Sequence, residues 1–332
     1  MQRFGIVGGG AWGTALAQVL RRAGREVVLW AREAEVVASI NESHANPLFL
    51  PDIALDPGIR ATGDLAAAAR SDVLLLAAPA QHFRATCRAL APSLPPTSPV
   101  IICTKGIEEE SGALMSEVIA ATLPQAGLAV LSGPTFAAEV ARGLPTAVTL
   151  AAADAALGQS LIAALGTRAF RPYLTDDIAG AQIGGAIKNV MAIACGVVMG
   201  RGFGDNARAA LITRGLAEMV RLAAAKSAKP ETLMGLSGLG DLTLTCSSTQ
   251  SRNNSLGIAL GQGESLAGYV ASRRSVAEGV SSAAAAASLA RKLGVDMPIV
   301  FAVDAILHHG AAIDQVIEAL LTRPFKAEAS RG

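Results

Sequence analysis

The chain has 332 residues, of which 51% are hydrophobic and 17% charged, and its 28 Lys and Arg residues nearly balance 27 Asp and Glu residues. At roughly 150 residues per domain, this length predicts about two domains. The high hydrophobic content excludes an intrinsically disordered chain, and the net charge of +1 excludes the strongly basic surface typical of nucleic acid binding. We therefore expect a globular protein with no nucleic acid partner.

Three further features of the sequence concern membrane spans, a secretory signal and metal binding. No apolar run approaches the roughly 18 residues of a membrane span, and residues 190–200, the longest clean run, indicate a buried helix segment. Residues 3–7 already have the pattern of a first strand, so we expect no secretory signal. The four cysteines lie far apart without a CxxC pair or a nearby His, which predicts a reduced, cytoplasmic protein without a metal site. They are Cys87, Cys103, Cys195 and Cys246.

The first half of the chain alternates short apolar runs with stretches at helical spacing. Continuous apolar runs of four to six residues suit strands that are buried on both faces, as in a parallel sheet covered by helices. The pattern therefore predicts an α/β domain with a doubly wound parallel sheet at residues 1–175. The expected strands are 3–7, 26–30, 73–77, 100–103, 128–131, 146–150 and 169–174.

The second half has no further strand pattern and consists of long Ala-, Leu- and Val-rich stretches. Thr175 is followed by Asp176 and Asp177, which predicts a helix start with a capping hydroxyl and acidic first-turn residues. We expect an all-helical second domain at residues 176–332, and its Ala-rich helices favour a homodimer. The clearest expected helices are 178–199, 207–228, 280–293 and 298–308.

A glycine motif, GxGxxG, lies between the first strand and an apolar-periodic helix. Gly8 would permit a tight turn, Gly10 would let the backbone approach a pyrophosphate, and Gly13 would let the helix pack against the sheet. Free N–H groups at the helix start favour an anion. In this context the motif predicts a dinucleotide site; the alternative is a purely structural glycine turn.

The end of the second expected strand bears on which dinucleotide is bound. An acid there holds a ribose 2′-hydroxyl, whereas an arginine accommodates a 2′-phosphate. Here Arg32 comes first and Glu33 follows it. We expect NADPH to be preferred and NADH to be accepted, the alternative being that Arg32 is an ordinary solvated cation.

Lys188 is the one lysine in an otherwise apolar helical stretch. Burying an ammonium is expensive, so this side chain either extends to the surface or faces a polar cavity that uses it. Gly184 and Gly185 lie one turn earlier and would leave space on the same face. Desolvation would lower the pKa of the lysine toward neutrality, as acid–base catalysis requires. The four histidines, His44, His82, His308 and His309, suggest no proton relay.

Polar loops follow the helix that carries Lys188 and two of the expected strands. Residues 247–255 contain Arg252 among hydroxyls and amides at a helix start, which suits either a phosphate or a solvated loop. Asp241 ends a glycine-rich loop at 235–241 and could orient a lysine or bind a substrate hydroxyl. Lys105 and residues 132–136 follow strands at the carboxyl edge, where open α/β sheets bind ligands, although Lys105 could also be an ordinary loop cation.

Seven motifs in this order resemble the bacterial NAD(P)-dependent glycerol-3-phosphate dehydrogenases, over roughly residues 3–320. They are GGGAWGTALA from Gly8, NESHANPLFLP from Asn41, CTKGIE from Cys103, SGPTFAAEVARGLPTAV from Ser132, IKNVMAIACGVVMGRGFGDNARAALITRGLAEM from Ile187, GLSGLGDLTLTCSSTQSRNN from Gly235 and VAEGV from Val276.

The resemblance implies a Rossmann-like sheet domain followed by an all-α domain similar to that of phosphogluconate dehydrogenase. It implies reversible reduction of dihydroxyacetone phosphate to sn-glycerol 3-phosphate for phospholipid synthesis. Lys188 would be the proton donor and acceptor, with Asp241 holding the network that positions it. The implied substrate residues are Lys105, Gly133, Thr135, Lys188, Asp241, Ser251, Arg252 and Asn253. The implied cofactor residues are Gly8, Gly10, Ala11, Trp12, Gly13, Arg32, Lys105, Ala137, Arg252, Val276 and Glu278.

This chain departs from the family pattern at Ala11, where many relatives carry Ser. The departure removes a hydroxyl near the pyrophosphate and leaves the backbone contacts. Two alternative functions are a dehydrogenase of the same fold that acts on a hydroxyacid, and a dinucleotide-sensing module without catalysis. A buried lysine in an apolar helix argues against the second, because a sensor has no use for it.

Overall fold

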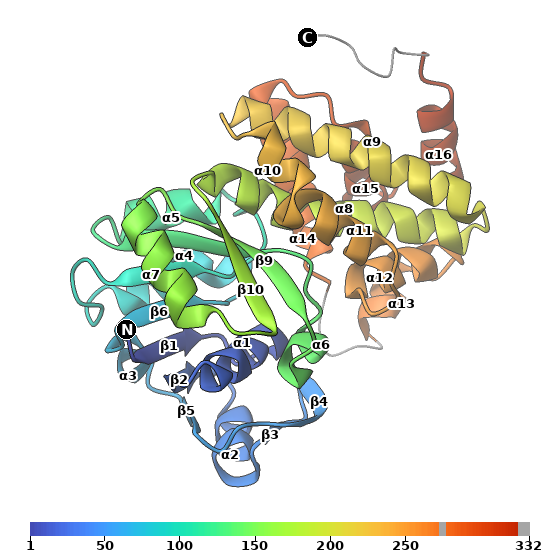
Figure 1. Ribbon diagram of the computed structural model, residues 1–332. Coiled ribbons are helices and arrows are strands. Elements are labelled where there is room, and N and C mark those ends of the chain that lie inside the picture. The colour runs from blue at the N-terminus through green and yellow to red at the C-terminus, as the bar shows by residue number, and fades with distance from the viewer. Residues whose placement is uncertain (272–276, 325–332) are drawn as a thin grey trace.

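The computed structural model describes residues 1–271 and 277–324. The N-terminal half forms a sheet with helices on both faces, and the C-terminal half is helical, as predicted (Figure 1). The two halves meet where helix α8 (Ile178–Gly200) leaves the sheet and enters the helical part.

The sheet has eight strands in the order β10-β9-β8-β7-β6-β1-β2-β5. All neighbouring pairs are parallel except β8 and β9. The strand order reverses between β1 and β6, where a doubly wound sheet binds its ligand. The strands are β1 (Arg3–Val7), β2 (Glu26–Trp30), β5 (Ile59–Thr62), β6 (Val73–Leu76), β7 (Pro99–Ile102), β8 (Gly127–Ser132), β9 (Thr146–Ala151) and β10 (Phe170–Thr175).

The predicted parallel sheet is confirmed except at β9, which pairs antiparallel with β8, with Leu131 opposite Leu150. The connection between these two strands contains only the short helix α6 (Ala137–Arg142), whereas parallel neighbours are usually joined by a longer crossover helix. Three strands were not predicted, namely the edge strand β5 and the hairpin of β3 (Ala45–Asn46) and β4 (Leu50–Ala54).

Both faces of the sheet are buried, as continuous apolar runs predict. Ile6 and Leu75 belong to one apolar cluster, whereas Val7, Leu74 and Leu76 belong to the cluster on the other face. The helices that cover the sheet are α1 (Ala11–Arg22), α2 (Ala34–Ser43), α3 (Leu65–Ala69), α4 (Ala80–Leu90), α5 (Met115–Thr122), α6 and α7 (Ala155–Leu165).

Helix α8 is the centre of the helical half. It packs closely against α12, because Gly196 on α8 faces Gly257 on α12 with no side chain between the backbones. The other elements are α9 (Gly204–Ala225), α10 (Pro230–Met234), the π-helical turn η1 (Leu236–Gly240), α11 (Asp241–Cys246), α12 (Arg252–Gly261), α13 (Leu266–Ala271), α14 (Gly279–Leu293), α15 (Pro298–His308) and α16 (Ile313–Leu321).

By length and composition alone, α8 could also cross a membrane. However, 83% of its most apolar window is buried inside the protein. Burial to this degree is typical of the core helix of a globular domain, in agreement with the buried segment expected at residues 190–200.

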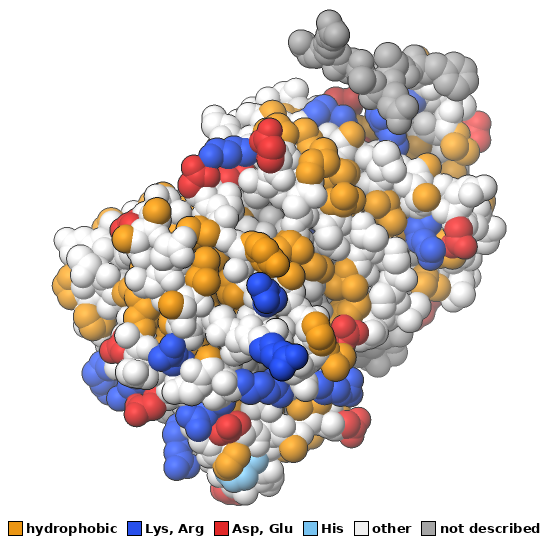
Figure 2. Space-filling view, in the orientation of Figure 1, with side chains coloured by type: hydrophobic (Ala, Val, Ile, Leu, Met, Phe, Trp, Pro, Cys, Tyr) orange, Lys and Arg blue, Asp and Glu red, His pale blue; other side chains and the backbone are white. Residues whose placement is uncertain are grey.

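Charged side chains are unevenly distributed on the face shown in Figure 2. Lys and Arg side chains gather over the sheet half, and charged groups are more thinly spread over the helical half. All four cysteines are buried and free.

Candidate active site

The glycine loop after β1 has the conformation that the motif predicts. Gly8 has φ +130°, and a Cβ atom there would lie 2.7 Å from the carbonyl oxygen of Ala77. A Cβ atom at Gly13 would overlap the carbonyl oxygen of Gly8, so only glycine lets α1 start this close to β1. A Cβ atom at Gly10 would meet nothing within 4 Å. The loop is therefore closed on the protein side and open at Gly10.

Three residues beside this loop lie at the start of α1 and of α6. Ala11 and Trp12 begin α1, and Ala137 begins α6; all three are partly buried against the same apolar cluster. The indole N–H of Trp12 is buried and has no hydrogen-bond partner among the described residues. A buried donor without a partner is costly, and a ligand beside the loop would supply one.

Arg32 lies at the surface just after β2. Its side chain is 76% exposed, and its guanidinium donates to Glu33 through Nε at 3.1 Å and Nη2 at 2.9 Å. The guanidinium is therefore reachable by a phosphate at the end of β2, although it already has a carboxylate partner. This arrangement is compatible with a 2′-phosphate and also with an ordinary surface ion pair.

Lys188 does not extend to the surface but is buried, with 6% of its surface exposed. Its Nζ donates to Asp241 Oδ1 at 2.5 Å and to Thr245 Oγ1 at 3.1 Å. Asp241 is fully buried, and its other oxygen, Oδ2, accepts from Lys105 Nζ at 2.7 Å. One carboxylate is thus shared by two ammonium groups, one from each half of the molecule.

The pKa of Lys188 is lowered to about 8, mainly because burial removes water from the ammonium. The Asp241 carboxylate opposes this shift, and the nearby Lys105 charge adds to it. A lysine with this pKa exchanges protons readily near neutral pH, as a general acid–base group must.

Gly184 and Gly185, which precede Lys188, do not leave the open space that the sequence predicts. The space beside them is filled by other protein groups. A Cβ atom at Gly184 would overlap the carbonyl of Ser237 in η1, and one at Gly185 would lie 2.9 Å from Ser132 Oγ and 3.2 Å from Lys105 Cγ. The two glycines therefore let η1 and Lys105 approach α8, and so bring Asp241 and Lys105 to Lys188.

The loop after β8 completes the lysine cluster. Lys105 Nζ also donates to the carbonyl of Gly133 at 2.9 Å and to Thr135 Oγ1 at 3.4 Å. It lies 6.0 Å from the centre of the Trp12 ring, within the range of a cation–π contact. Lys105 thus connects the glycine loop, the β8 loop and Asp241.

Three predicted substrate residues, Ser251, Arg252 and Asn253, lie at the start of α12 and differ in burial and in hydrogen bonding. Ser251 caps the helix, because its Oγ accepts from Asn254 N at 3.2 Å. Asn253 is buried and already bonded, donating to Asn189 Oδ1 at 2.9 Å and accepting from Gly279 N at 2.8 Å. Arg252, by contrast, has an exposed side chain in the first turn of α12.

Two predicted cofactor residues lie close to an undescribed segment. Val276 falls outside the described residues. Glu278 is exposed and is the N-cap of α14, where its backbone carbonyl accepts from Ser282 N at 3.0 Å.

The two halves of the chain match two family models. Residues 3–158 match the N-terminal part of NAD-dependent glycerol-3-phosphate dehydrogenase, and residues 177–318 match its C-terminal part. The chain belongs to the NAD-dependent glycerol-3-phosphate dehydrogenase family. The resemblance inferred from the seven motifs is thereby confirmed.

Individual members of this family are similar over nearly the whole chain. A glycerol-3-phosphate dehydrogenase [NAD(P)+] of Parvibaculum lavamentivorans is 58% identical over 327 residues, 98% of both chains. One from Paramagnetospirillum magneticum is 69% identical over 255 residues, 77% of this chain and 93% of the relative. The crystal structure of a glycerol-3-phosphate dehydrogenase from Coxiella burnetii has a TM-score of 0.93 and 39% identity, and the match covers 97% of this chain and 99% of that one.

More distant dehydrogenases share only the fold. A D-mandelate dehydrogenase, which represents the hydroxyacid alternative, is 17% identical with a TM-score of 0.64. Both family models and the full-length relatives therefore favour glycerol-3-phosphate dehydrogenase over a hydroxyacid enzyme.

Thr245 was not predicted from the sequence, although it contacts both Lys188 and Asp241. Its hydroxyl lies 3.1 Å from Lys188 Nζ and donates to the backbone carbonyl of Asp241 at 2.6 Å. The available signal was spacing, since Asp241 and Thr245 are four residues apart and share one face of α11.

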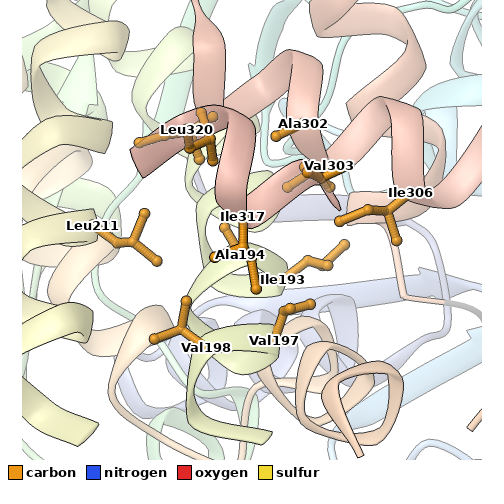
Figure 3. Close-up of a pocket in the computed structure, with 12 residues that line it drawn as sticks. Ile193, Ala194, Val197, Val198, Leu211, Ala302, Val303, Ile306, Ile317 and Leu320 are labelled. Carbon is orange, nitrogen blue, oxygen red and sulfur yellow. The ribbon is translucent and has the colours of Figure 1, made fainter. Parts of the chain in front are cut away.

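The helical half also contains an apolar pocket that is separate from the cluster of Lys188, Asp241 and Lys105. The pocket lies between α8, α9, α15 and α16 (Figure 3). Aliphatic side chains such as Val197, Leu211, Val303 and Ile317 line it. It offers no group that could hold a phosphate or transfer a proton.

Proposed function

We propose that this protein catalyses the reversible reduction of dihydroxyacetone phosphate to sn-glycerol 3-phosphate, the precursor for phospholipid synthesis. NADPH is the expected cofactor, and NADH is accepted too. The observation that carries this proposal is the buried cluster of Lys188, Asp241 and Lys105 beside the glycine loop. It places a lysine with a pKa of about 8 at the carboxyl edge of the sheet.

The residues around the glycine loop fit a dinucleotide. The space beside Gly10 is open, and the indole N–H of Trp12 has no partner within residues 1–271 and 277–324, so room and a donor are present there. Gly8, Ala11 and Gly13 would shape the pyrophosphate site, and Arg32 would meet a 2′-phosphate. Further cofactor contacts are proposed for Lys105, Ala137, Arg252, Val276 and Glu278. When bound, the cofactor supplies the hydride for C2 of the substrate.

Lys188 supplies the proton for this reduction. The C2 carbonyl oxygen gains negative charge as the carbonyl is reduced, and the Lys188 ammonium donates a proton to it. Asp241 and Thr245 hold the ammonium in one position through the bonds at 2.5 Å and 3.1 Å. In the reverse direction the neutral amine accepts the proton from the substrate hydroxyl.

The substrate phosphate is proposed to bind at the start of α12. Gly133, Thr135 and Asn253 would lie around the rest of the substrate, with Ser251 capping the helix that receives the phosphate. Arg252 is the exposed cation in the first turn, and a guanidinium there can form two charge-assisted bonds to a phosphate. Remote phosphate binding would orient the reacting carbon of a small substrate.

Comparing two substrates tests this function. Arg252→Ala should lower kcat/KM for dihydroxyacetone phosphate about a hundredfold or more, while unphosphorylated dihydroxyacetone, a poor substrate, should lose far less. Arg208→Ala, which removes an arginine near the start of α9, is the matched control. Equal losses for both substrates would show that Arg252 does not bind the phosphate. Turnover of a 2-oxo acid, without turnover of dihydroxyacetone phosphate, would contradict the proposed function itself.

The proposal also includes two domains, a homodimer and a cytoplasmic location. Residues 1–175 would form the dinucleotide-binding domain and residues 176–332 the substrate domain, since the last strand ends at Thr175. We expect a cytoplasmic homodimer. Helix α16 supports the dimer, because none of its nine residues, all of them described, is buried, and Leu321 is 73% exposed. Sedimentation velocity of the purified protein would distinguish a dimer from a monomer.

A further inference from the structure

A buried amide on the β3–β4 hairpin holds the glycine loop from behind. Asn46 is fully buried, and its Nδ2 donates to the carbonyl of Gly9 at 2.9 Å and to Thr14 Oγ1 at 2.8 Å. Its Oδ1 accepts from Phe49 N at 3.3 Å. The Thr14 hydroxyl lies 3.4 Å from the same Gly9 carbonyl. The backbone of the loop is therefore fixed by a side chain that lies 37 residues further along the chain than Gly9.

The orientation of one peptide group links this amide to the ligand side of the loop. Gly9 O and Gly10 N–H belong to the same planar trans peptide and point in opposite directions. Holding the carbonyl therefore also fixes the direction of the Gly10 N–H. No hydrogen bond within the described residues uses that N–H as donor, and the space beside Gly10 is open.

The backbone at Gly9 is packed tightly against the end of β2. A Cβ atom at Gly9 would overlap the side chain of Ala31 at the end of β2, so this residue is already packed tightly on one side. The N-cap of α1, Gly10, has no side chain to accept from the first-turn N–H groups. The direction of the Gly10 N–H thus depends on the bonds to the Gly9 carbonyl, with which it shares a peptide group.

We propose that Asn46 is a positioning residue for the cofactor, which aligns the Gly10 N–H with the pyrophosphate through the Gly9 carbonyl. This inference rests on the proposed dinucleotide site. The alternative is that Asn46 only attaches the β3–β4 hairpin to α1. Cofactor affinity distinguishes the two, because attachment of the hairpin contributes to stability without orienting the N–H.

Gln18 provides a matched control. It lies on the same helix and ties the same hairpin region to it, donating from Nε2 to the carbonyl of Ala54 at 3.0 Å and accepting from Asp56 N at 2.8 Å. Like Asn46, it is a buried amide with bonds to backbone groups of the hairpin region. Among the described residues it forms no hydrogen bond to the glycine loop, so Gln18→Ala removes attachment only.

The experiment measures NADPH binding without substrate, from nicotinamide fluorescence, and thermal unfolding of each variant. Asn46→Ala should raise the Kd for NADPH at least about tenfold. Asn46→Asp should raise it further, because it loses the same donor and also places a negative charge against the Gly9 carbonyl oxygen. Gln18→Ala should lower Tm comparably but keep Kd within about twofold of the wild type. At saturating NADPH, Asn46→Ala should retain the KM for dihydroxyacetone phosphate.

Several results would overturn the inference. An unchanged Kd in the Asn46 variants, or an equal rise in Gln18→Ala, would reduce Asn46 to hairpin attachment. If the Asn46 variants do not fold, Thr14→Val is the second test. It removes both contacts of the Thr14 hydroxyl, the one that accepts from Asn46 Nδ2 and the one beside the Gly9 carbonyl, so an unchanged Kd would contradict a role for this hydrogen-bonded group in aligning the Gly10 N–H. Wild-type protein that binds NADPH but does not reduce dihydroxyacetone phosphate would refute the proposed function alone. Wild-type protein that binds no dinucleotide would refute both.

Discussion

Replacing Asp241 by Asn should remove the negative charge that Lys188 and Lys105 share. Asp241 is fully buried and accepts from Lys188 at 2.5 Å and from Lys105 at 2.7 Å. Asparagine keeps the size and one acceptor oxygen but removes the negative charge. The variant would leave the buried Lys188 ammonium close to the partly buried Lys105 ammonium, with no carboxylate between them.

The magnitude follows from the separation of the charges. Opposite charges about 4 Å apart attract by roughly 4 kcal/mol at an effective dielectric constant of about 20, which corresponds to about three pKa units. Relaxation and hydration will recover part of this, so we expect the pKa of Lys188 to fall by at least about one unit from its value of about 8. Breaking a buried ion pair also costs about 3–5 kcal/mol of folding stability.

The assay is the pH dependence of kcat in both directions. Reduction requires the ammonium, so wild-type kcat for reduction should fall as pH rises through about 8, and oxidation should gain over the same range. In Asp241→Asn both transitions should move to a pH at least about one unit lower. Loss of orientation should also reduce kcat for reduction about a hundredfold.

Asp304→Asn is the control for lost stability. Asp304 is also a buried carboxylate, paired with Arg291 at 3.0 Å and His309 at 3.3 Å. Its replacement should lower Tm and leave the alkaline transition near pH 8. An Asp241→Asn enzyme whose transition stays at the wild-type pH would refute the view that this carboxylate sets the proton affinity of Lys188.

Three other substitutions test separate parts of the structure. Lys188→Ala should fold and bind NADPH, since Asp241 keeps Lys105 as a partner, but turnover should fall at least about a hundredfold; near-normal turnover would remove Lys188 from the mechanism. Arg32→Ala should raise KM for NADPH about tenfold and barely affect NADH, because only NADPH loses a phosphate contact, and equal changes for both would place Arg32 elsewhere. Glu218 is buried with a pKa raised to about 7 by desolvation, against a usual value of 4.5, so folded protein binds the extra proton and stability should fall as pH rises from about 4.5 to 7. Thermal unfolding of Glu218→Gln should lack this component, and parallel Tm curves from pH 5 to 8 would contradict it.

The fold could be predicted where the local pattern and the burial agree. Central strands such as Val73–Leu76 are buried on both sides and are apolar at every position, so their sequence alone reveals them. Edge strand Ile59–Thr62 contains an exposed Arg60 and has no such pattern. The antiparallel direction of β9 is a matter of its pairing with β8, which apolar periodicity does not reveal.

The site could be predicted as a set of residues but not as a geometry. The unusual position of Lys188 in an apolar helix drew attention to it, and burial with a lowered pKa agrees with that interpretation. Sequence could not show that Asp241 bridges two lysines, because those partners are 53 and 136 residues away along the chain. Nor could it show that Asn253 is already bonded to Asn189, since asparagine in a polar loop gives no sign of its partner.

The net charge of the cluster of Lys188, Asp241 and Lys105 is unfavourable in the protein alone but stabilises the transition state of the reaction. Two ammonium groups and one carboxylate leave one uncompensated positive charge in a buried place, which is costly. Reduction of the C2 carbonyl generates one negative charge on oxygen, so the imbalance is neutralised as the transition state forms. When the proton has moved, Lys188 is neutral, and Asp241 is left with Lys105 alone. Since Lys105 comes from the sheet half and the other two residues from the helical half, this balance exists only when the halves are docked.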